Sequence, residues 1–165
     1  MSAPPGLDGF VAGFDYPMFV VTAADPGTGH RAGCLVGFAT QASIEPFRFL
    51  VCLSRQNHTF EVAYSAPFLA VHVLDLQQQT LAELFGSQTG DEVEKFDHCA
   101  WRPGPGGVPL LLEAPRRLVG RVLDRFDLGD HQGFLLEPAD LMIGAEADPL
   151  SFQGVTEMTP GHPAG

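Results

Sequence analysis

The stretch that most constrains the fold runs from residue 33 to residue 59, GCLVGFATQASIEPFRFLVCLSRQNHT, because it joins two apolar runs to a polar turn. The first run, 33–42, has a small or apolar residue at nearly every position and no charge. This pattern indicates a strand that is buried on both faces or covered on one face by a flat ligand. Gly37 lies midway along the run, where a glycine marks a bulge or the close approach of another group.

The second run, 47–53, is apolar apart from one arginine and leads into the hexapeptide SRQNHT. Ser54, Asn57 and Thr59 offer neutral hydrogen-bond donors, and Arg55 offers a cationic fork. Asn57 is also a favourable N-cap for a helix that starts at the next residue, and the N-terminus of a helix attracts anions. From these residues alone, the turn is either a phosphate site or an ordinary capped turn.

Composition and charge limit the class of protein. The chain has 165 residues, of which 45% are hydrophobic and 18% charged, which fits a single globular domain over residues 1–165. We expect a core at about 14–145, a flexible N-terminal arm and a C-terminal tail that is disordered beyond Gly154. The formal net charge of -11 argues against nucleic acid and anionic membranes as partners, because both reward clustered Lys and Arg.

Neither a membrane-spanning stretch nor a signal peptide is evident in the sequence, so we expect a cytoplasmic protein. The three cysteines, Cys34, Cys52 and Cys99, lack the spacing of metal ligands. Buried, reduced thiols and no metal site are therefore expected.

Many short apolar runs separated by turn residues favour a small β-barrel with peripheral helices over a doubly wound parallel sheet. No glycine fingerprint for dinucleotide binding follows a strand. Two short helices are expected, at 57–65 and at 76–85 with Gly86 as the C′ residue, and the segment 87–109 is expected to be irregular. The expected strands are 16–22, one from Arg31 that pairs antiparallel with it, 47–53, 68–74, 110–113, 117–126 and 134–143.

Four ordered motifs resemble the flavin reductase-like family, whose members have the FMN-binding split barrel and include reductase components of two-component flavin monooxygenases. The resemblance covers roughly 16–143. This sequence has Leu35, Gly37 and Phe38 where the family usually has Thr, Asn or Ser, and a small residue. The motifs are a strand and bend (Gly33, Leu35, Gly37, Phe38, Gln41, Ser43, Pro46), the turn from Cys52 to Thr59, Glu94-Lys95-Phe96, and Gly129-Asp130-His131.

The resemblance implies a mainly β, Greek-key split barrel that works as a homodimer. It implies an FMN-binding NAD(P)H:flavin oxidoreductase, with FAD as the alternative flavin and NADH or NADPH as electron donor, that supplies reduced flavin to a partner monooxygenase. Two other functions stay open: a non-enzymatic flavin-binding or sensor protein, and a split barrel that holds heme or another flat cofactor. Hydride chemistry would belong to the cofactor, so no side chain needs to act as an acid or a nucleophile.

The resemblance also implies roles for particular residues. His131 would position the nicotinamide or the flavin ring, and Phe96 would cover the dimethylbenzene side of that ring. Each group has a purely structural role as its alternative. Residues 40–42 could be a solvated strand end and 54–59 an ordinary capped turn, while Phe96 could anchor a loop and His131 could be a surface histidine. The residues expected to bind the cofactor are Leu35, Val36, Gly37, Phe38, Thr40, Gln41, Ala42, Cys52, Ser54, Arg55, Asn57, Thr59, Phe96 and His131. Phe96 and Trp101 in the long segment are also expected to anchor the homodimer.

Overall fold

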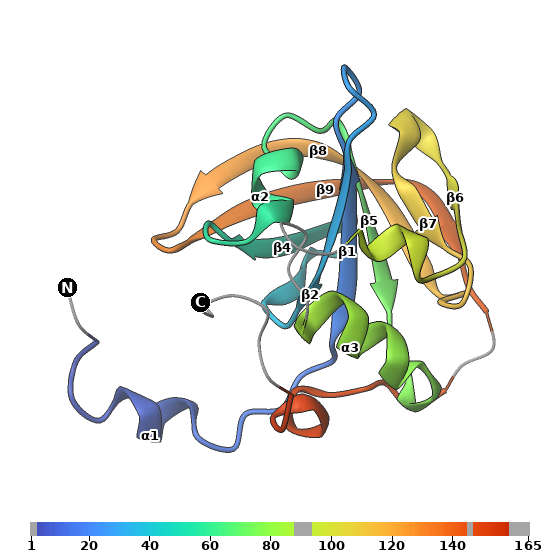
Figure 1. Cartoon of the computed structure of the whole chain (residues 1–165). Helices are drawn as coiled ribbons and strands as arrows, with labels where there is room; N and C mark the ends of the chain where they lie inside the picture. The colour runs from blue at the N-terminus through green and yellow to red at the C-terminus, as the bar shows by residue number, and fades with distance from the viewer. Residues whose placement is uncertain (1–2, 88–93, 145–146, 159–165) are drawn as a thin grey trace.

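The computed structural model describes residues 3–87, 94–144 and 147–158, and its centre is a seven-stranded antiparallel sheet (Figure 1). The strands follow the order β2-β1-β5-β8-β9-β4-β3 across the sheet. Their bounds are β1 Phe19–Ala24, β2 Arg31–Val36, β3 Ala39–Ser43, β4 Arg48–Ser54, β5 Phe68–Val73, β8 Arg117–Asp127 and β9 His131–Met142. The prediction of a mainly β fold with peripheral helices is confirmed, as is the antiparallel pairing of the first two strands.

The remaining elements surround this sheet (Figure 1). The α-helices are α1 Leu7–Val11, α2 His58–Ala63 and α3 Gln79–Ser87. The short 3-10 helices are η1 Leu76–Gln78, η2 Lys95–Asp97, η3 Pro105–Gly107 and η4 Phe152–Val155. A separate hairpin consists of β6 Trp101–Pro103 and β7 Pro109–Leu111. None of the helices in the described part of the chain is both long and apolar enough to cross a membrane.

The link between β2 and β3 determines the shape of the sheet. These two strands are consecutive in sequence but lie at opposite edges of the sheet, and only Gly37 and Phe38 join them. The sheet must therefore curl until its edges approach. β2 contacts β4, yet the sheet order contains no ladder between them, so the barrel stays split along this line.

The single strand expected over 33–42 is thus wrong, because the chain breaks at Gly37 and crosses to the other edge. At the crossing the carbonyl oxygen of Phe38 accepts a hydrogen bond from the Cys52 nitrogen at 2.8 Å. Gly37 does mark a close approach: a Cβ there would lie 2.6 Å from a ring carbon of Tyr16.

Three hydrophobic clusters stabilise the protein, and β1 contributes to the two larger ones, because all six of its residues are buried. Val21 faces the cluster beneath α2, and Val20 faces the cluster beneath α3, as the period-two alternation of a strand requires. The first cluster includes Val51, Leu53, Leu69 and Phe134, and the second includes Leu74, Leu81, Phe85, Leu111 and Leu150.

Three boundaries differ from expectation. The last strand starts at His131 rather than residue 134, because His131 pairs with Ser54 at the end of β4. Gly86 lies inside α3 rather than beyond its end. The segment 87–109 was expected to be irregular, but within 94–109 it contains η2, η3 and β6 and the start of β7, and Thr22 Oγ1 fixes the hairpin by donating to the Pro109 carbonyl at 2.6 Å.

The C-terminal segment is more ordered than expected. Val155 and Leu150 are buried in the second cluster, and Met158 packs against that cluster. Backbone bridges join Pro17 to Ser151 and Asp75 to Pro149. The prediction of disorder beyond Gly154 is therefore wrong for 155–158, and the rest of that tail lies outside the described residues.

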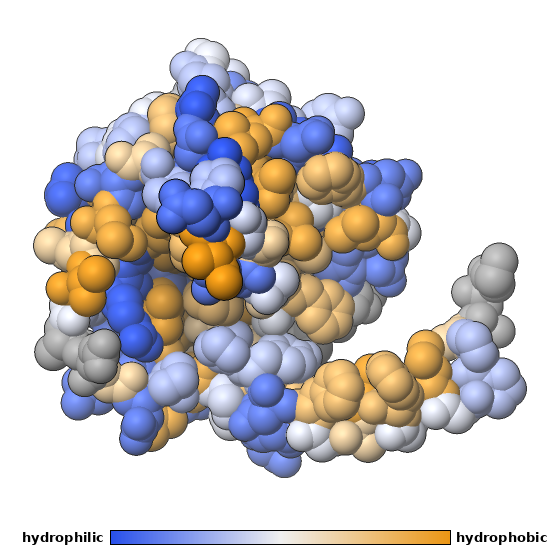
Figure 2. Space-filling model, turned by 180° about the vertical axis from the view of Figure 1, so that it is seen from behind, coloured by the Kyte–Doolittle hydropathy of each residue, from blue (hydrophilic) through white to orange (hydrophobic). Residues whose placement is uncertain are grey.

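The N-terminal arm, by contrast, extends away from the body of the protein, and its hydrophobic side chains can be followed in Figure 2. None of the α1 residues is buried. At its base, the amide nitrogen of Gln153 donates to Asp15 Oδ1 at 2.9 Å, and Gln153 Nε2 donates to the Phe14 carbonyl at 3.0 Å.

Candidate functional site

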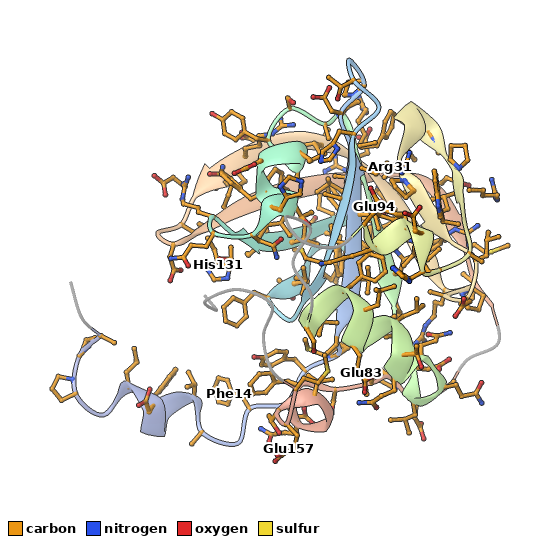
Figure 3. The ribbon with its side chains drawn as sticks, in the orientation of Figure 1. Phe14, Arg31, Glu83, Glu94, His131 and Glu157 are labelled. Carbon is orange, nitrogen blue, oxygen red and sulfur yellow. The ribbon has the colours of Figure 1, made fainter. Side chains whose placement is uncertain are left out.

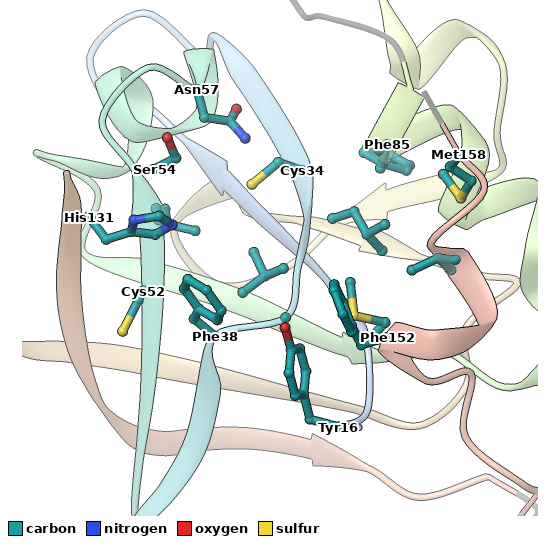
Figure 4. Close-up of a pocket in the computed structure, with 17 residues that line it drawn as sticks. Tyr16, Cys34, Phe38, Cys52, Ser54, Asn57, Phe85, His131, Phe152 and Met158 are labelled. Atoms are coloured by element: carbon teal, nitrogen blue, oxygen red, sulfur yellow. The ribbon is translucent and has the colours of Figure 1, made fainter. Parts of the chain in front are cut away.

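A pocket of about 230 Å³ opens at the split of the barrel (Figure 4). Its wall combines the end of β2, the Gly37–Phe38 crossing, the end of β4, the start of α2, the end of α3 and the C-terminal segment. It is lined by Tyr16, Met18, Cys34, Leu35, Val36, Gly37, Phe38, Cys52, Leu53, Ser54, Asn57, Phe85, Gly86, His131, Phe152, Val155 and Met158.

Aromatic rings form one continuous wall of this pocket. Phe152 stacks on Tyr16 with 4.8 Å between the ring centroids and 22° between their planes. Tyr16 lies 6.3 Å from Phe38, and Phe38 lies 5.0 Å from the imidazole of His131. Such a series of ring faces and edges suits a flat, aromatic ligand.

The polar corner of the pocket is the turn between β4 and α2. Asn57 is the N-cap of α2 as predicted, because its Oδ1 accepts a hydrogen bond from the Thr59 nitrogen at 3.0 Å. Ser54 Oγ accepts from the Gln56 nitrogen at 3.3 Å. Ser54 and Asn57 are both buried and both line the pocket, so hydroxyl and amide groups lie at the end opposite Phe152 (Figure 4).

His131 lies beside this corner at the start of β9 (Figures 3 and 4). Its Nδ1 is 2.7 Å from Asp130 Oδ1. An ionised carboxylate only accepts hydrogen bonds, so Nδ1 carries the proton and donates to Asp130. This pairing orients the ring and leaves Nε2 as the nitrogen that can interact with a ligand.

The two pocket cysteines are unsuited to nucleophilic chemistry. Burial raises the pKa of the Cys34 thiol, and hydrogen bonding with Thr59 and the charge of Lys95 only partly oppose that rise. Burial also raises the pKa of Cys52. Because the thiolate is the reactive form, both residues act as small apolar parts of the wall. All three cysteines are free thiols, but of the three predicted to be buried only Cys34 is, while Cys52 and Cys99 are partly exposed.

Eight of the predicted cofactor residues meet at this pocket: Leu35, Val36, Gly37, Phe38, Cys52, Ser54, Asn57 and His131. Thr40, Gln41 and Ala42 lie on the exposed edge strand β3, outside the lining. Thr59 is buried behind Asn57. Roles for these four residues in binding stay predictions.

Arg55 is also outside the lining, because its guanidinium points toward the β8–β9 turn. Its Nε donates to the Gly129 carbonyl at 2.9 Å. Its Nη2 donates to Gln132 Oε1 at 2.9 Å and forms an ion pair with Asp127 Oδ1 at 2.8 Å. Arg55 therefore links two turns in this structure, and its predicted role at a phosphate stays a prediction.

Phe96 lies in the second core cluster, where only 4% of its surface is exposed. It packs edge-to-face against Phe85 at 5.6 Å and Trp101 at 5.7 Å between centroids. Phe96 thus supports the pocket residue Phe85 from behind rather than lining the pocket. Of the two predicted dimer anchors, Phe96 is buried in the chain's own core, and the partly buried Trp101 packs against that core.

Sequence reasoning missed the part of the wall formed by the two ends of the chain. Tyr16 and Phe152 stack because the Phe152 nitrogen donates to the Tyr16 carbonyl at 2.8 Å. No local pattern relates positions so far apart. Met18, Phe85, Gly86, Val155 and Met158 were missed for the same reason: they reach the pocket through tertiary packing.

Comparison with known proteins shows one family and several relatives. The model of the family described as flavin reductase like domain matches residues 11–157. A ferric-chelate reductase (NAD(P)H) of Archaeoglobus fulgidus is 27% identical over 139 residues, which are 83% of this chain and 81% of the relative. The 4-hydroxyphenylacetate 3-monooxygenase reductase component of Pseudomonas aeruginosa is 27% identical over 134 residues, 81% of this chain and 78% of the relative.

A solved structure confirms the fold alone. The flavin reductase domain protein from Arthrobacter sp. FB24 superposes with a TM-score of 0.79 at 19% sequence identity. The alignment covers 96% of this chain and 94% of that one.

Proposed function

This chain belongs to the flavin reductase-like domain family, and from that premise we propose that it is an NAD(P)H:flavin oxidoreductase that binds FMN in the pocket at the barrel split. The observation that carries the proposal is the composition of that pocket. An aromatic wall from Phe152 to His131 faces the cavity, and a polar corner with Ser54 and Asn57 closes one end. FMN needs the same combination: a flat apolar surface for its ring and hydrogen-bond donors for its phosphate.

The residues present fit FMN in kind. Tyr16, Phe38 and Phe152 would cover the ring, and the hydroxyl of Ser54 and the amide of Asn57 would meet the phosphate end. Bound flavin would supply the hydride acceptor. The chain's own residues would hold the ring, exclude water from one face of it, and orient the nicotinamide through His131, whose ring is fixed by Asp130.

A second copy of the chain is proposed to complete the site. The pocket of about 230 Å³ is smaller than the 300 Å³ or more that is usual for small-molecule sites. The chain also has an apolar groove of about 470 Å³, lined by Phe47, Phe49, Val73, Leu141 and Met142 among others. Of these, Leu141 is 60% exposed, and a contiguous exposed apolar surface is typical of a subunit interface.

A partner outside this chain is proposed as well. The relative from Pseudomonas aeruginosa is named as a reductase component of a monooxygenase. We propose that this chain passes reduced flavin to a flavin-dependent monooxygenase. The packing of α2, α3 and the small β6–β7 hairpin around one seven-stranded sheet supports a single domain, and the cytoplasmic location stays a prediction from the sequence.

The experiment that tests the proposal titrates the apo-protein with FMN, FAD and riboflavin while following flavin fluorescence, and then follows NADH and NADPH consumption with the preferred flavin. Saturable FMN binding with NAD(P)H oxidation above the free-flavin background is expected. Binding without oxidation would leave a flavin-binding or sensor protein. An absorption spectrum of heme in the purified protein, with no flavin binding, would identify the other class of flat cofactor.

A further inference from the structure

Lys95 is the only lysine in the sequence, and it is buried. Only 5% of its surface is exposed. Its Nζ donates to the carbonyl oxygen of Gly33 at 3.1 Å and to that of Phe85 at 3.2 Å. The ammonium thus joins the edge strand β2 to the last turn of α3, where helix carbonyls lack intrahelical partners.

No carboxylate within the described part of the chain pairs with this ammonium. The ion pairs found there involve Arg48, Arg55, His58, Arg121 and His131. Glu94, the acidic neighbour, instead accepts a hydrogen bond from the Phe96 nitrogen at 3.2 Å. Arg31, Glu94 and Lys95 line the same small cleft, and Figure 3 labels Arg31 and Glu94. The two carbonyl groups stabilise the ammonium, but as neutral dipoles they leave its net charge in place.

Burial of an ammonium that has no carboxylate partner among the described residues is costly. Burial accordingly lowers the pKa of Lys95, an effect that Cys34 opposes. A neutral donor such as a glutamine could satisfy two carbonyl oxygens with a smaller desolvation cost. A charge at this position therefore calls for a role beyond hydrogen bonding.

The position of the charge indicates that role. Phe85, whose carbonyl accepts from Lys95, lines the pocket, and Gly33 directly precedes the pocket residue Cys34. The charge also lowers the pKa of the Cys34 thiol, against the larger effect of burial. The ammonium is therefore close behind the pocket wall and acts electrostatically on groups in that wall.

Hydride transfer changes the charge in the pocket. NAD(P)H gives up one hydride, that is two electrons and one proton, and becomes NAD(P)⁺. An uncharged flavin ring that accepts the hydride gains one negative charge, so atoms and charge balance without another reactant. A bound flavin ring would thus be neutral before the step and anionic after it.

Resting on the proposed function, we propose that Lys95 is a positioning and charge-balancing residue: its ammonium holds β2 and α3 at the back of the pocket and stabilises reduced FMN over oxidised FMN. The effect acts through the pocket wall without contact to the flavin. It is a difference in interaction with the two redox forms, so it changes their relative affinities.

The test measures dissociation constants of oxidised FMN and of anaerobically reduced FMN in parallel. Lys95→Gln keeps a donor for the carbonyl groups and removes the charge. It should weaken binding of reduced FMN about tenfold more than binding of oxidised FMN, as expected for loss of one nearby charge at an intermediate dielectric constant. Lys95→Arg, which keeps the charge, should retain most of the wild-type ratio of the two constants.

Arg31→Gln is the matched control, because Arg31 is a cation in the same cleft. Its guanidinium stacks on Trp101 at 4.5 Å rather than on the pocket wall. The ratio of its two dissociation constants should stay near that of wild type.

Equal weakening of both FMN forms in Lys95→Gln would show a purely structural lysine and overturn the proposal. Failure of both Lys95→Gln and Lys95→Met to fold, judged by circular dichroism, would also overturn it. If the wild-type protein binds neither FMN form, the proposed function itself fails, and this inference fails with it.

Discussion

The ring centroids of Phe38 and His131 lie 5.0 Å apart, with 47° between the ring planes. Phe38 belongs to the crossing between the two edges of the sheet, and His131 starts β9. Their contact therefore joins the split of the barrel to the turn that orients His131. Phe38 is 49% exposed, which leaves its ring accessible to a bound ligand.

This contact leads to a prediction for His131. Replacing it with Ala should leave FMN affinity within about tenfold, roughly 1.4 kcal/mol, because the aromatic wall and the polar corner stay. NAD(P)H oxidation should fall more strongly, since hydride transfer is sensitive to small errors in position. Fluorescence titration and steady-state assays measure the two effects. His98→Ala serves as the control, because His98 is exposed and outside the pocket. Equal oxidation rates in wild type and His131→Ala with FMN fully bound would contradict a role in reduction.

Asn57 allows helix capping to be separated from phosphate recognition. Asn57→Asp keeps a good N-cap for α2 but places a carboxylate at the polar corner of the pocket. FMN affinity should fall by about tenfold or more, riboflavin affinity should change little, and the denaturant midpoint should stay near wild type. Asn57→Ala should instead lower the free energy of unfolding by about 1 kcal/mol. A parallel loss of FMN and riboflavin affinity in Asn57→Asp would place the phosphate elsewhere.

His72 predicts a specific pH dependence of stability. Its Nδ1 lies 3.0 Å from the Val20 carbonyl, and its Nε2 accepts from the Leu111 nitrogen at 3.0 Å, so the folded state holds neutral imidazole. Burial lowers the pKa of His72 to about 4. The unfolded chain takes up the proton near its ordinary pKa of 6.5. The contribution of His72 to stability is therefore complete above pH 6.5 and is lost as the pH falls toward 4, by up to about 3 kcal/mol.

Urea unfolding at several pH values measures this effect. The decrease between pH 6.5 and 4 should be smaller in His72→Gln than in wild type. His98→Gln should keep the wild-type decrease, because His98 is exposed in the folded protein. An identical pH profile in wild type and His72→Gln would show that other groups cause the whole dependence.

Gly37 is expected to tolerate no side chain. A Cβ at this position would meet Tyr16 ring carbons at 2.6 and 3.4 Å and the sulfur of Met18 at 3.2 Å. Gly37→Ala should lower the free energy of unfolding by about 1–3 kcal/mol. It should also lower the affinity for FMN, because Tyr16 and Met18 both line the pocket. Gly9→Ala is the control, since a Cβ at Gly9 meets nothing within 4 Å. An unchanged midpoint in Gly37→Ala would mean that the Tyr16 ring moves aside freely.

The proposed homodimer has its own test. Leu141→Asp places a charge in the apolar groove and should shift the protein toward monomer in light scattering. Leu112→Asp, at a similarly exposed leucine outside the groove, should leave the mass unchanged. A monomeric wild-type protein that binds FMN tightly would contradict the proposal that a second copy completes the pocket.

Local sequence patterns predicted the parts of the fold that depend on neighbouring residues. Short apolar runs separated by turn residues predicted most strands, and Asn57 predicted the start of α2 because N-capping involves residues only two positions apart. The patterns failed at Gly37, where an uninterrupted apolar run concealed a crossing between sheet edges. Apolar residues satisfy either arrangement equally, so only the closure of the whole sheet decides between them.

The residues of the candidate site also fall into those that local motifs predicted and those that tertiary packing brings to the pocket. Ser54, Asn57 and His131 lie in recognisable turns and were predicted together with their neighbours. Tyr16 and Phe152 come from opposite ends of the chain and meet through the backbone bonds around the Pro17–Ser151 bridge. Phe96 was assigned to the pocket from its motif, but its burial beside Phe85 depends on how η2 packs, which the sequence does not indicate.

The burial of the only lysine also makes the protein's slow motions accessible to chemistry. An acylating reagent can modify Lys95 only after the contact of its ammonium with β2 and α3 opens, because the folded protein leaves this amine almost no access to solvent. The acylation rate of Lys95 therefore reports the local opening of the back of the pocket, in the way that amide exchange reports local unfolding. A ligand that binds only the closed pocket should slow this reaction in proportion to its occupancy.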